Sequence, residues 1–288
     1  MTVEELIRNC DDLPTLPDVY LRVKEVVENP KASMVDLARA LSVDPAMTAK
    51  VLKLVNSSFY GLSGKIETVS RAASILGMQP IHDLVLATSV GTAFSKASSP
   101  IMDMHVFWQS SVERGLLARL TAKWCNLVDS ERLFVGGLLC DIGHLVIFQH
   151  IPDLAAQALN QAKTEKTRRT TCQRELLGFD AAEVGAELLK EWNLPLNYQQ
   201  GTRHHMNPSQ VPDCSLEIEI LHIAGMITEC QLLDIPRDQW MQWITVEDKE
   251  LQELTDEDLD GFMAVVQEDL HMMLDLISPA LARATVSP

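Results

Sequence analysis

A short segment near the middle of the chain carries three side chains that could do chemistry: Cys140, Asp141 and His144. Cysteine and histidine are ligands for a soft metal such as zinc, whereas aspartate suits harder divalent cations. Cys140 could bind zinc together with His144 or His204. However, a spacing of four residues within an apolar run is also typical of helix core packing.

Each of these residues also has a structural interpretation. Asp141 is then a buried carboxylate that caps or bonds a neighbouring helix, because buried polar groups are almost always hydrogen-bonded. His144 is then a partly buried helix residue that pairs with Asp141. The adjacent His204 and His205 lie at a predicted helix end, where they can contact exposed carbonyl groups.

A second candidate is a helix-turn-helix spacing over residues 37–52, with a small residue in the first helix and polar residues early in the second. In DNA-binding proteins those early residues reach base edges in the major groove. Here they are Ala46, Met47, Thr48 and Lys50, and none can make the bidentate base contacts of Arg, Asn or Gln. A compact helical corner is therefore the favoured interpretation.

Residues 136–145, GGLLCDIGHL, resemble the central motif of the HD superfamily, whose usual form is Gly-Leu-Leu-His-Asp-Ile-Gly-Lys. The enzymes of that superfamily bind divalent metals through the adjacent His and Asp, a His on an earlier helix and an Asp on a later one. The metal activates water to attack a phosphoester.

The resemblance extends, in order, over roughly residues 10–230 and is to the HDOD domain (HD-related output domain). The matching blocks are 13–17 (LPTLP), 42–57 (SVDPAMTAKVLKLVNS), 70–77 (SRAASILG), 107–111 (FWQSS), 178–186 (GFDAAEVGA), 192–195 (WNLP) and 203–205 (RHH). The corner at 37–52 is a normal part of these domains, which argues against DNA binding.

The resemblance places Ser110, Cys140, Ala181 and Gly225 at positions where HD enzymes carry metal ligands. Asp141 alone cannot supply the several carboxylate and imidazole ligands that a hard divalent metal prefers. We therefore predict no catalytic residue, no bound metal and no cofactor, and leave open a small anion or nucleotide at the remaining pocket. The predicted vestigial HD-type site consists of Ser110, Cys140, Asp141, His144, Ala181, His204 and His205.

Helical periodicity dominates the sequence, so we predict an all-α protein with two lobes. The predicted parts are an N-terminal helical lobe (1–99), a degenerate HD-type helical bundle (100–232) and an acidic C-terminal helical extension (233–288). Within the bundle, residues 130–150 are predicted to form one continuous helix. In the extension, a capped helix begins at residues 255–258 and presents an apolar stripe under an acidic face.

Composition limits the compartment and the partners. The 288 residues carry a net charge of −16, which is poorly suited to neutralising phosphate backbones. No apolar run reaches the ~18 residues of a membrane span, and the acidic N-terminus does not resemble a secretory signal. The cysteines are scattered without a CxxC pair, as in free thiols of a reducing cytoplasm.

The resemblance implies a bacterial, cytoplasmic signal-transduction protein. We predict a non-catalytic output domain that acts through protein contacts, with no specific nucleic acid, no membrane and a homo-oligomer left open. One alternative is an atypical metal-dependent phosphohydrolase acting on a phosphoester or nucleotide. The other is a transcription regulator that uses residues 33–56.

Overall fold

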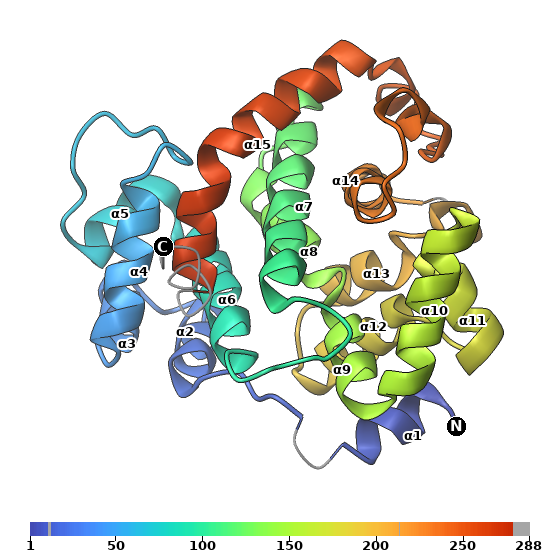
Figure 1. The fold of residues 1–288 in the computed structure, drawn as a ribbon. Helices are drawn as coiled ribbons and strands as arrows, with labels where there is room; N and C mark the ends of the chain where they lie inside the picture. Colours follow the sequence, from blue (N-terminus) through green and yellow to red (C-terminus); the bar gives the residue numbers. More distant parts are fainter. Residues whose placement is uncertain (11–12, 213, 279–288) are drawn as a thin grey trace, which may run out of the picture. The chain divides into compact units, whose positions relative to one another are not determined.

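The computed structural model describes residues 1–10, 13–212 and 214–278, and it is helical throughout these ranges, with no strand (Figure 1). The all-α prediction is confirmed. The α-helices are α1 (Val3–Arg8), α2 (Asp18–Glu28), α3 (Met34–Leu41), α4 (Pro45–Val55), α5 (Val69–Leu76), α6 (Met78–Ala93), α7 (Met104–Trp124), α8 (Ser130–Leu139), α9 (Ile142–His150), α10 (Pro152–Glu165), α11 (Arg169–Leu177), α12 (Ala181–Glu191), α13 (Leu196–His204), α14 (Leu216–Leu232) and α15 (Asp256–Ile277).

The chain forms two compact units. Unit 1 contains residues 1–13 and 97–266, and unit 2 contains residues 14–96 with the chain from Gln267 onward. The N-terminal segment belongs to unit 1, in which α1 packs against α12. The division also falls within α15.

Unit 2 is built around α6, in which every residue from Ile81 to Gly91 is buried. Local signals fix the ends of its helices: Ser33 and Asp36 form a capping box at α3, and Asp44 caps α4 ahead of Pro45. The end of α15 approaches α6 so closely that a Cβ atom at Gly91 would lie 1.9 Å from the carbonyl oxygen of Ile277. The last turns of α15 are therefore core of this unit.

Unit 1 is built around the pair α7 and α8, against which α14 packs. A Cβ atom at Gly137 would lie 2.8 Å from the carbonyl oxygen of Arg114, so only glycine permits this approach of α8 to α7. On the other side of α8, α9 packs on α12. These contacts bring together the ends of helices that carry the candidate site.

The predicted continuous helix over 130–150 is wrong, because the structure ends α8 at Leu139 and starts α9 at Ile142. The break lets α9 approach α12, where a Cβ atom at Gly143 would lie 2.0 Å from the carbonyl oxygen of Ala181. By length and mean hydropathy, Ser130–His150 qualifies as a candidate membrane span, which the search for an uninterrupted apolar run did not find. Of its best window, 89% is buried inside the protein, as in a core segment.

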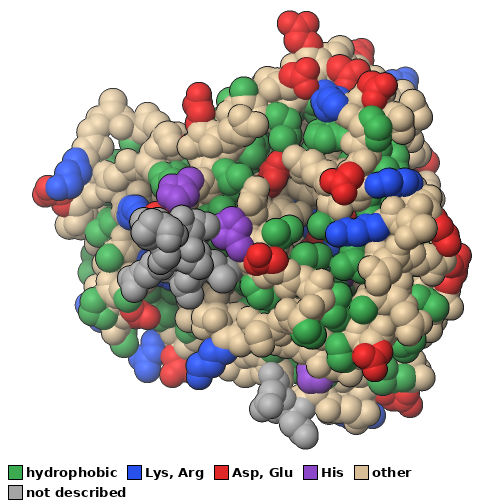
Figure 2. Space-filling model, viewed as in Figure 1, with side chains coloured by type: hydrophobic (Ala, Val, Ile, Leu, Met, Phe, Trp, Pro, Cys, Tyr) green, Lys and Arg blue, Asp and Glu red, His purple; other side chains and the backbone are tan. Residues whose placement is uncertain are grey.

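Residues 233–254 are held against α14 by buried side chains. The Thr245 N–H donates to His222 Nε2 (3.1 Å), and the Glu219 carboxylate accepts from the N–H groups of Glu247 and Asp248 (3.0 and 2.9 Å). Beyond them, Thr255 and Asp258 form the predicted reciprocal cap of α15. Acidic side chains gather where α15 begins, around Arg237 (Figure 2).

Candidate functional site

Asp141 lies in the break between α8 and α9, with 6% of its surface exposed. Its carboxylate is gripped by two guanidinium groups from other helices. Nη2 of Arg114, on α7, donates to Oδ2 at 2.8 Å. Nη1 of the same guanidinium lies 2.8 Å from Oδ1 as an ion-pair contact, without hydrogen-bond geometry. Arg169, the first residue of α11, approaches Oδ2 from a second direction at 3.0 Å.

The two arginines are buried as well, and each has a further partner on α14. Arg114 donates from Nε and Nη2 to the Thr228 hydroxyl, at 3.0 and 2.8 Å. Arg169 donates from its backbone N–H and from Nε to the Glu229 carboxylate, both at 2.7 Å. Two positive and two negative charges therefore form a closed, neutral network, which is what a buried ionic cluster requires.

The protonation state of Asp141 follows from this arrangement. Burial by itself disfavours the charged carboxylate of Asp141, but Arg114 and Arg169 outweigh burial and hold its pKa well below the ordinary value. The aspartate is ionised, and both of its oxygens are already used. It is not available as a ligand without breaking the buried ion pairs.

Cys140 precedes Asp141 and is fully buried. Burial raises the pKa of its thiol to about 12, so the sulfur stays protonated at neutral pH. A metal ligand must be the thiolate, so zinc binding at this residue would have to release a proton from a fully buried thiol.

His144 lies one turn after Asp141, with Nε2 3.8 Å from Oδ1 of that residue. Its Nδ1 lies 3.1 Å from the side-chain nitrogen of Gln173, whose oxygen accepts from the Ala181 N–H at 3.0 Å. This chain of bonds places the imidazole proton on Nε2, facing Asp141. Burial, reinforced by Arg169, lowers the pKa of His144 to about 3, so the ring is neutral.

The two histidines at the end of α13 differ. His204 is half-buried, whereas His205 is buried and donates from Nδ1 to the Thr202 carbonyl oxygen at 2.8 Å. Its ring lies against Gly225, where a Cβ atom would be 3.1 Å from Cδ2. An imidazole thus fills the space beside the position at which the HD resemblance expects an aspartate. Burial lowers the pKa of His205 to about 3.

Ser110 is half-buried on α7 and lines a groove between α7 and α14 rather than contacting Asp141. Thr228 lies in the same groove and is also the hydroxyl that Arg114 grips. Glu113 completes the wall, accepts from Gln231 at 2.6 Å, and has its pKa raised by burial. A groove that presents a carboxylate is poorly suited to a phosphate or nucleotide.

The structure thus brings Cys140, Asp141, His144, Ala181 and His205 into one buried cluster. Within the described residues, no group of three or more His, Cys, Asp or Glu side chains is placed to hold a metal ion. The residues present do not fit the metal of an HD enzyme, because guanidinium groups balance the charge of Asp141.

Five residues of the network were not predicted from the sequence: Arg114, Arg169, Gln173, Thr228 and Glu229. Their signal was a polar or charged side chain within a buried helix, such as Glu229 within an apolar stretch of α14. Such residues are rarely buried without a partner.

The helix-turn-helix-like corner of unit 2 uses its own polar groups internally. Met47 is buried, the Thr48 hydroxyl donates to the Leu41 carbonyl oxygen at 3.0 Å, and Lys50 is half-buried. Burial lowers the pKa of Lys50. Of the early residues of the second helix, Met47 and Thr48 are thus occupied in packing, and the exposed Ala46 has no polar group with which to contact a base edge.

Comparison with known proteins agrees with this architecture. The sequence pattern of the HDOD domain matches residues 13–208. An uncharacterized protein of Treponema pallidum (strain Nichols) is 26% identical over 208 residues, which is 70% of this chain. The chain spans 39% of the length of that relative.

Solved structures share the fold over nearly the whole chain. A "Putative phosphohydrolase" from Shewanella amazonensis SB2B superposes with a TM-score of 0.72 at 26% identity, covering 95% of this chain and 98% of its own. An HDOD domain protein with unknown function from Geobacter sulfurreducens gives 0.72 at 22% identity, covering 95% of both chains. A "Putative signal transduction protein" from Marinobacter aquaeolei VT8 gives 0.60 at 23% identity, covering 96% of this chain and 60% of its own. The chain belongs to the HDOD domain family.

Proposed function

We propose that this chain is a non-catalytic signalling module of a bacterial cytoplasm that acts through protein contacts. The observation that carries the proposal is that arginine side chains contact both carboxylate oxygens of Asp141. Arg114 lies 2.8 Å from each oxygen, and Arg169 lies 3.0 Å from one of them. Positive charge that a metal would supply in an HD enzyme is supplied here by side chains of the protein itself.

The surface of unit 2 supports protein contacts. α3 packs on both α2 and α5, and the Ser74 hydroxyl lies 3.3 Å from the Met34 sulfur. On these three neighbouring helices, large apolar side chains remain 39 to 59% exposed: Leu21, Met34, Val35 and Ile75. These side chains lie on helices that pack together, and exposed apolar surface is a feature of binding sites for other proteins.

A phosphohydrolase is the second candidate, and the name of the Shewanella relative is the observation that favours it. Hydrolysis would require a metal to displace two buried guanidinium groups from Asp141. Removing one partner of a buried ion pair typically costs about 3 to 5 kcal/mol, which opposes metal binding.

Elemental analysis and turnover assays on the purified chain separate the two candidates. We expect substoichiometric metal after exposure to Mn²⁺, Ni²⁺ or Zn²⁺, and no hydrolysis of phosphoesters or cyclic nucleotides above background. Stoichiometric metal together with turnover that a chelator abolishes would disprove the proposal.

The protein-contact part has its own test. The chain is used as bait in extract of its native cells, beside a Val35→Glu variant that places a charge among the exposed apolar side chains. We expect a specific partner to be captured by the wild-type chain and lost by the variant. An unchanged set of captured proteins would contradict a role for this surface.

A further inference from the structure

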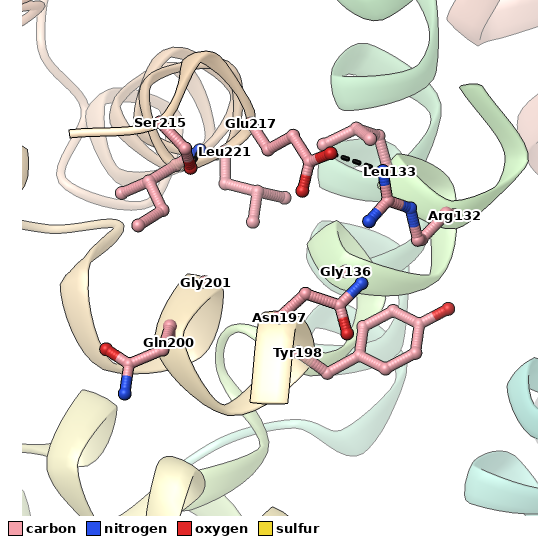
Figure 3. Close-up of a pocket in the computed structure, with 11 residues that line it drawn as sticks. Arg132, Leu133, Gly136, Asn197, Tyr198, Gln200, Gly201, Ser215, Glu217 and Leu221 are labelled. Carbon is pink, nitrogen blue, oxygen red and sulfur yellow. Dashed lines mark hydrogen bonds and ion pairs between the residues drawn. The ribbon is translucent and has the colours of Figure 1, made fainter. Parts of the chain in front are cut away.

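A second cavity in unit 1 lies outside the Asp141 cluster, between α8, α13 and α14 (Figure 3). It has about 370 Å³ of empty space, including its open mouth. The residues that matter for its chemistry are Arg132, Leu133, Asn197, Ser215, Glu217 and Leu221. None of them belongs to the predicted vestigial site.

Two glycines make room for the cavity. Leu221 packs over both Gly136 of α8 and Gly201 of α13. A Cβ atom at Gly201 would lie 2.8 Å from the end of the Leu221 side chain, and one at Gly136 would lie 3.3 Å from it. Leu221 is thereby accommodated against both helices and supplies, with Leu133, apolar lining of the cavity.

Two opposite charges lie in the same cavity as these leucines. Arg132 and Glu217 form an ion pair through one terminal nitrogen of the guanidinium, and both side chains are partly exposed. Figure 3 shows the amide of Asn197 pointing toward the guanidinium of Arg132 across the cavity. The Nε atom of Arg132 is buried and out of reach of a ligand. The ion pair with Glu217 uses one of the two terminal nitrogens of the guanidinium, which leaves the other as a donor for an acceptor in the cavity.

We propose that this cavity binds a small zwitterion, such as a free aliphatic α-amino acid. The ligand carboxylate accepts hydrogen bonds from Arg132 and Asn197, and its ammonium group donates to Glu217. The aliphatic side chain covers Leu133 and Leu221.

The charge balance of the cavity selects this class of ligand. A simple carboxylate would bring a negative charge close to Glu217, and a simple amine would bring a positive charge close to Arg132. A zwitterion offers each charged residue an opposite partner and keeps the cavity neutral, and such arrangements discriminate strongly against ligands that lack one group. This binding would be an input to the protein and does not depend on the proposed protein contacts.

Isothermal titration of the full chain with leucine tests the proposal, alongside 4-methylpentanoate and 3-methylbutylamine, which lack the ammonium and the carboxylate respectively. We expect saturable binding of leucine, and affinities at least about tenfold weaker for both analogues. Glycine, alanine and glutamine complete the panel. Equal affinity for leucine and an analogue would overturn the proposal, as would the absence of saturable binding for every amino acid at millimolar concentrations.

Variants locate the binding. Arg132→Gln and Asn197→Ala should each weaken leucine binding, the first by at least about tenfold, while Arg237→Gln, which breaks an exposed ion pair elsewhere in unit 1, should leave it unchanged. Asn197→Ala serves as the test should Arg132→Gln impair folding, which tryptophan fluorescence reports. Leucine binding that is unchanged in both folded variants would overturn the assignment to this cavity.

Discussion

Replacing Asp141 by asparagine would separate a structural carboxylate from a catalytic remnant. The substitution keeps the size of the side chain and removes its charge. Arg114 and Arg169 would keep only Thr228 and Glu229 as partners. The buried network then holds two positive charges against one negative charge.

The expected magnitude follows from the geometry. Asp141 makes three close contacts with guanidinium nitrogens, at 2.8, 2.8 and 3.0 Å, and both arginines are at most 5% exposed. Breaking a buried ion pair from one side typically destabilises a protein by about 3 to 5 kcal/mol. For a unit of this size, that corresponds to a decrease in Tm of roughly 6 to 20 °C.

Tryptophan fluorescence during urea unfolding is the appropriate assay, because all five tryptophans belong to unit 1. Asp153→Asn, an exposed aspartate of the same unit, is the control and should unfold within about 0.5 kcal/mol of the wild type. The double variant with Arg114→Met restores charge balance and should be more stable than Asp141→Asn alone. If Asp141→Asn stays within about 1 kcal/mol of wild-type stability, the Asp141 carboxylate does not stabilise the fold through its ion pairs with the two buried arginines.

Three further predictions concern the same unit. Gly143→Ala should destabilise unit 1 by about 1 to 3 kcal/mol in the same urea assay, because the added Cβ would force α9 away from α12. Gly261→Ala, at a helix position with open space around it, is the control and should be neutral or slightly stabilising. Equal effects of the two substitutions would refute the close approach of α9 to α12. The native Cys140 thiol, with a pKa of about 12, should resist alkylation at pH 8 until urea unfolds the protein, and rapid modification found by mass spectrometry would contradict its burial. Three buried histidines should make the protein lose stability as the pH falls below about 6.5, since their folded pKa values are depressed and the unfolded chain binds more protons. They are His144, His205 and His222. Each contributes about 2 kcal/mol to the loss of stability between pH 7 and pH 5. Urea titrations at several pH values should give a smaller slope of unfolding free energy against pH for His144→Gln than for the wild type. An unchanged slope would count against a neutral His144.

Much of the helical framework could be predicted because its signals are local. The reciprocal bonds of Ser33 with Asp36 and of Thr255 with Asp258 are made three residues apart, within the window that a sequence pattern samples. The break at Asp141 could not be predicted in this way. Residues 133–148 are mostly apolar, with Asp141 and His144 as exceptions, and the segments on either side of the break pack on other helices.

The chemistry of the site was hidden for the same reason. Asp141 lies 27 residues from Arg114 and 28 from Arg169, and Arg169 lies 60 residues from Glu229. The motif around Asp141 located the centre of the cluster. Which side chains meet its carboxylate depends on which helices come together there, and this is determined by tertiary packing.

The sign of the stability change on replacing Asp141 therefore distinguishes a catalytic carboxylate from a structural one. A carboxylate kept for catalysis is commonly a burden to the fold, because its buried charge is held ready for a ligand, and removing it tends to stabilise the protein. A carboxylate kept to neutralise two guanidinium groups has the opposite effect, because its removal leaves buried positive charge without a partner. The geometry around Asp141, with both oxygens bound and no metal-ligand group among the described residues, predicts a loss of stability. On this reasoning, the aspartate of the HD-like motif neutralises the buried arginines of α7 and α11, where these helices meet α9 and α14.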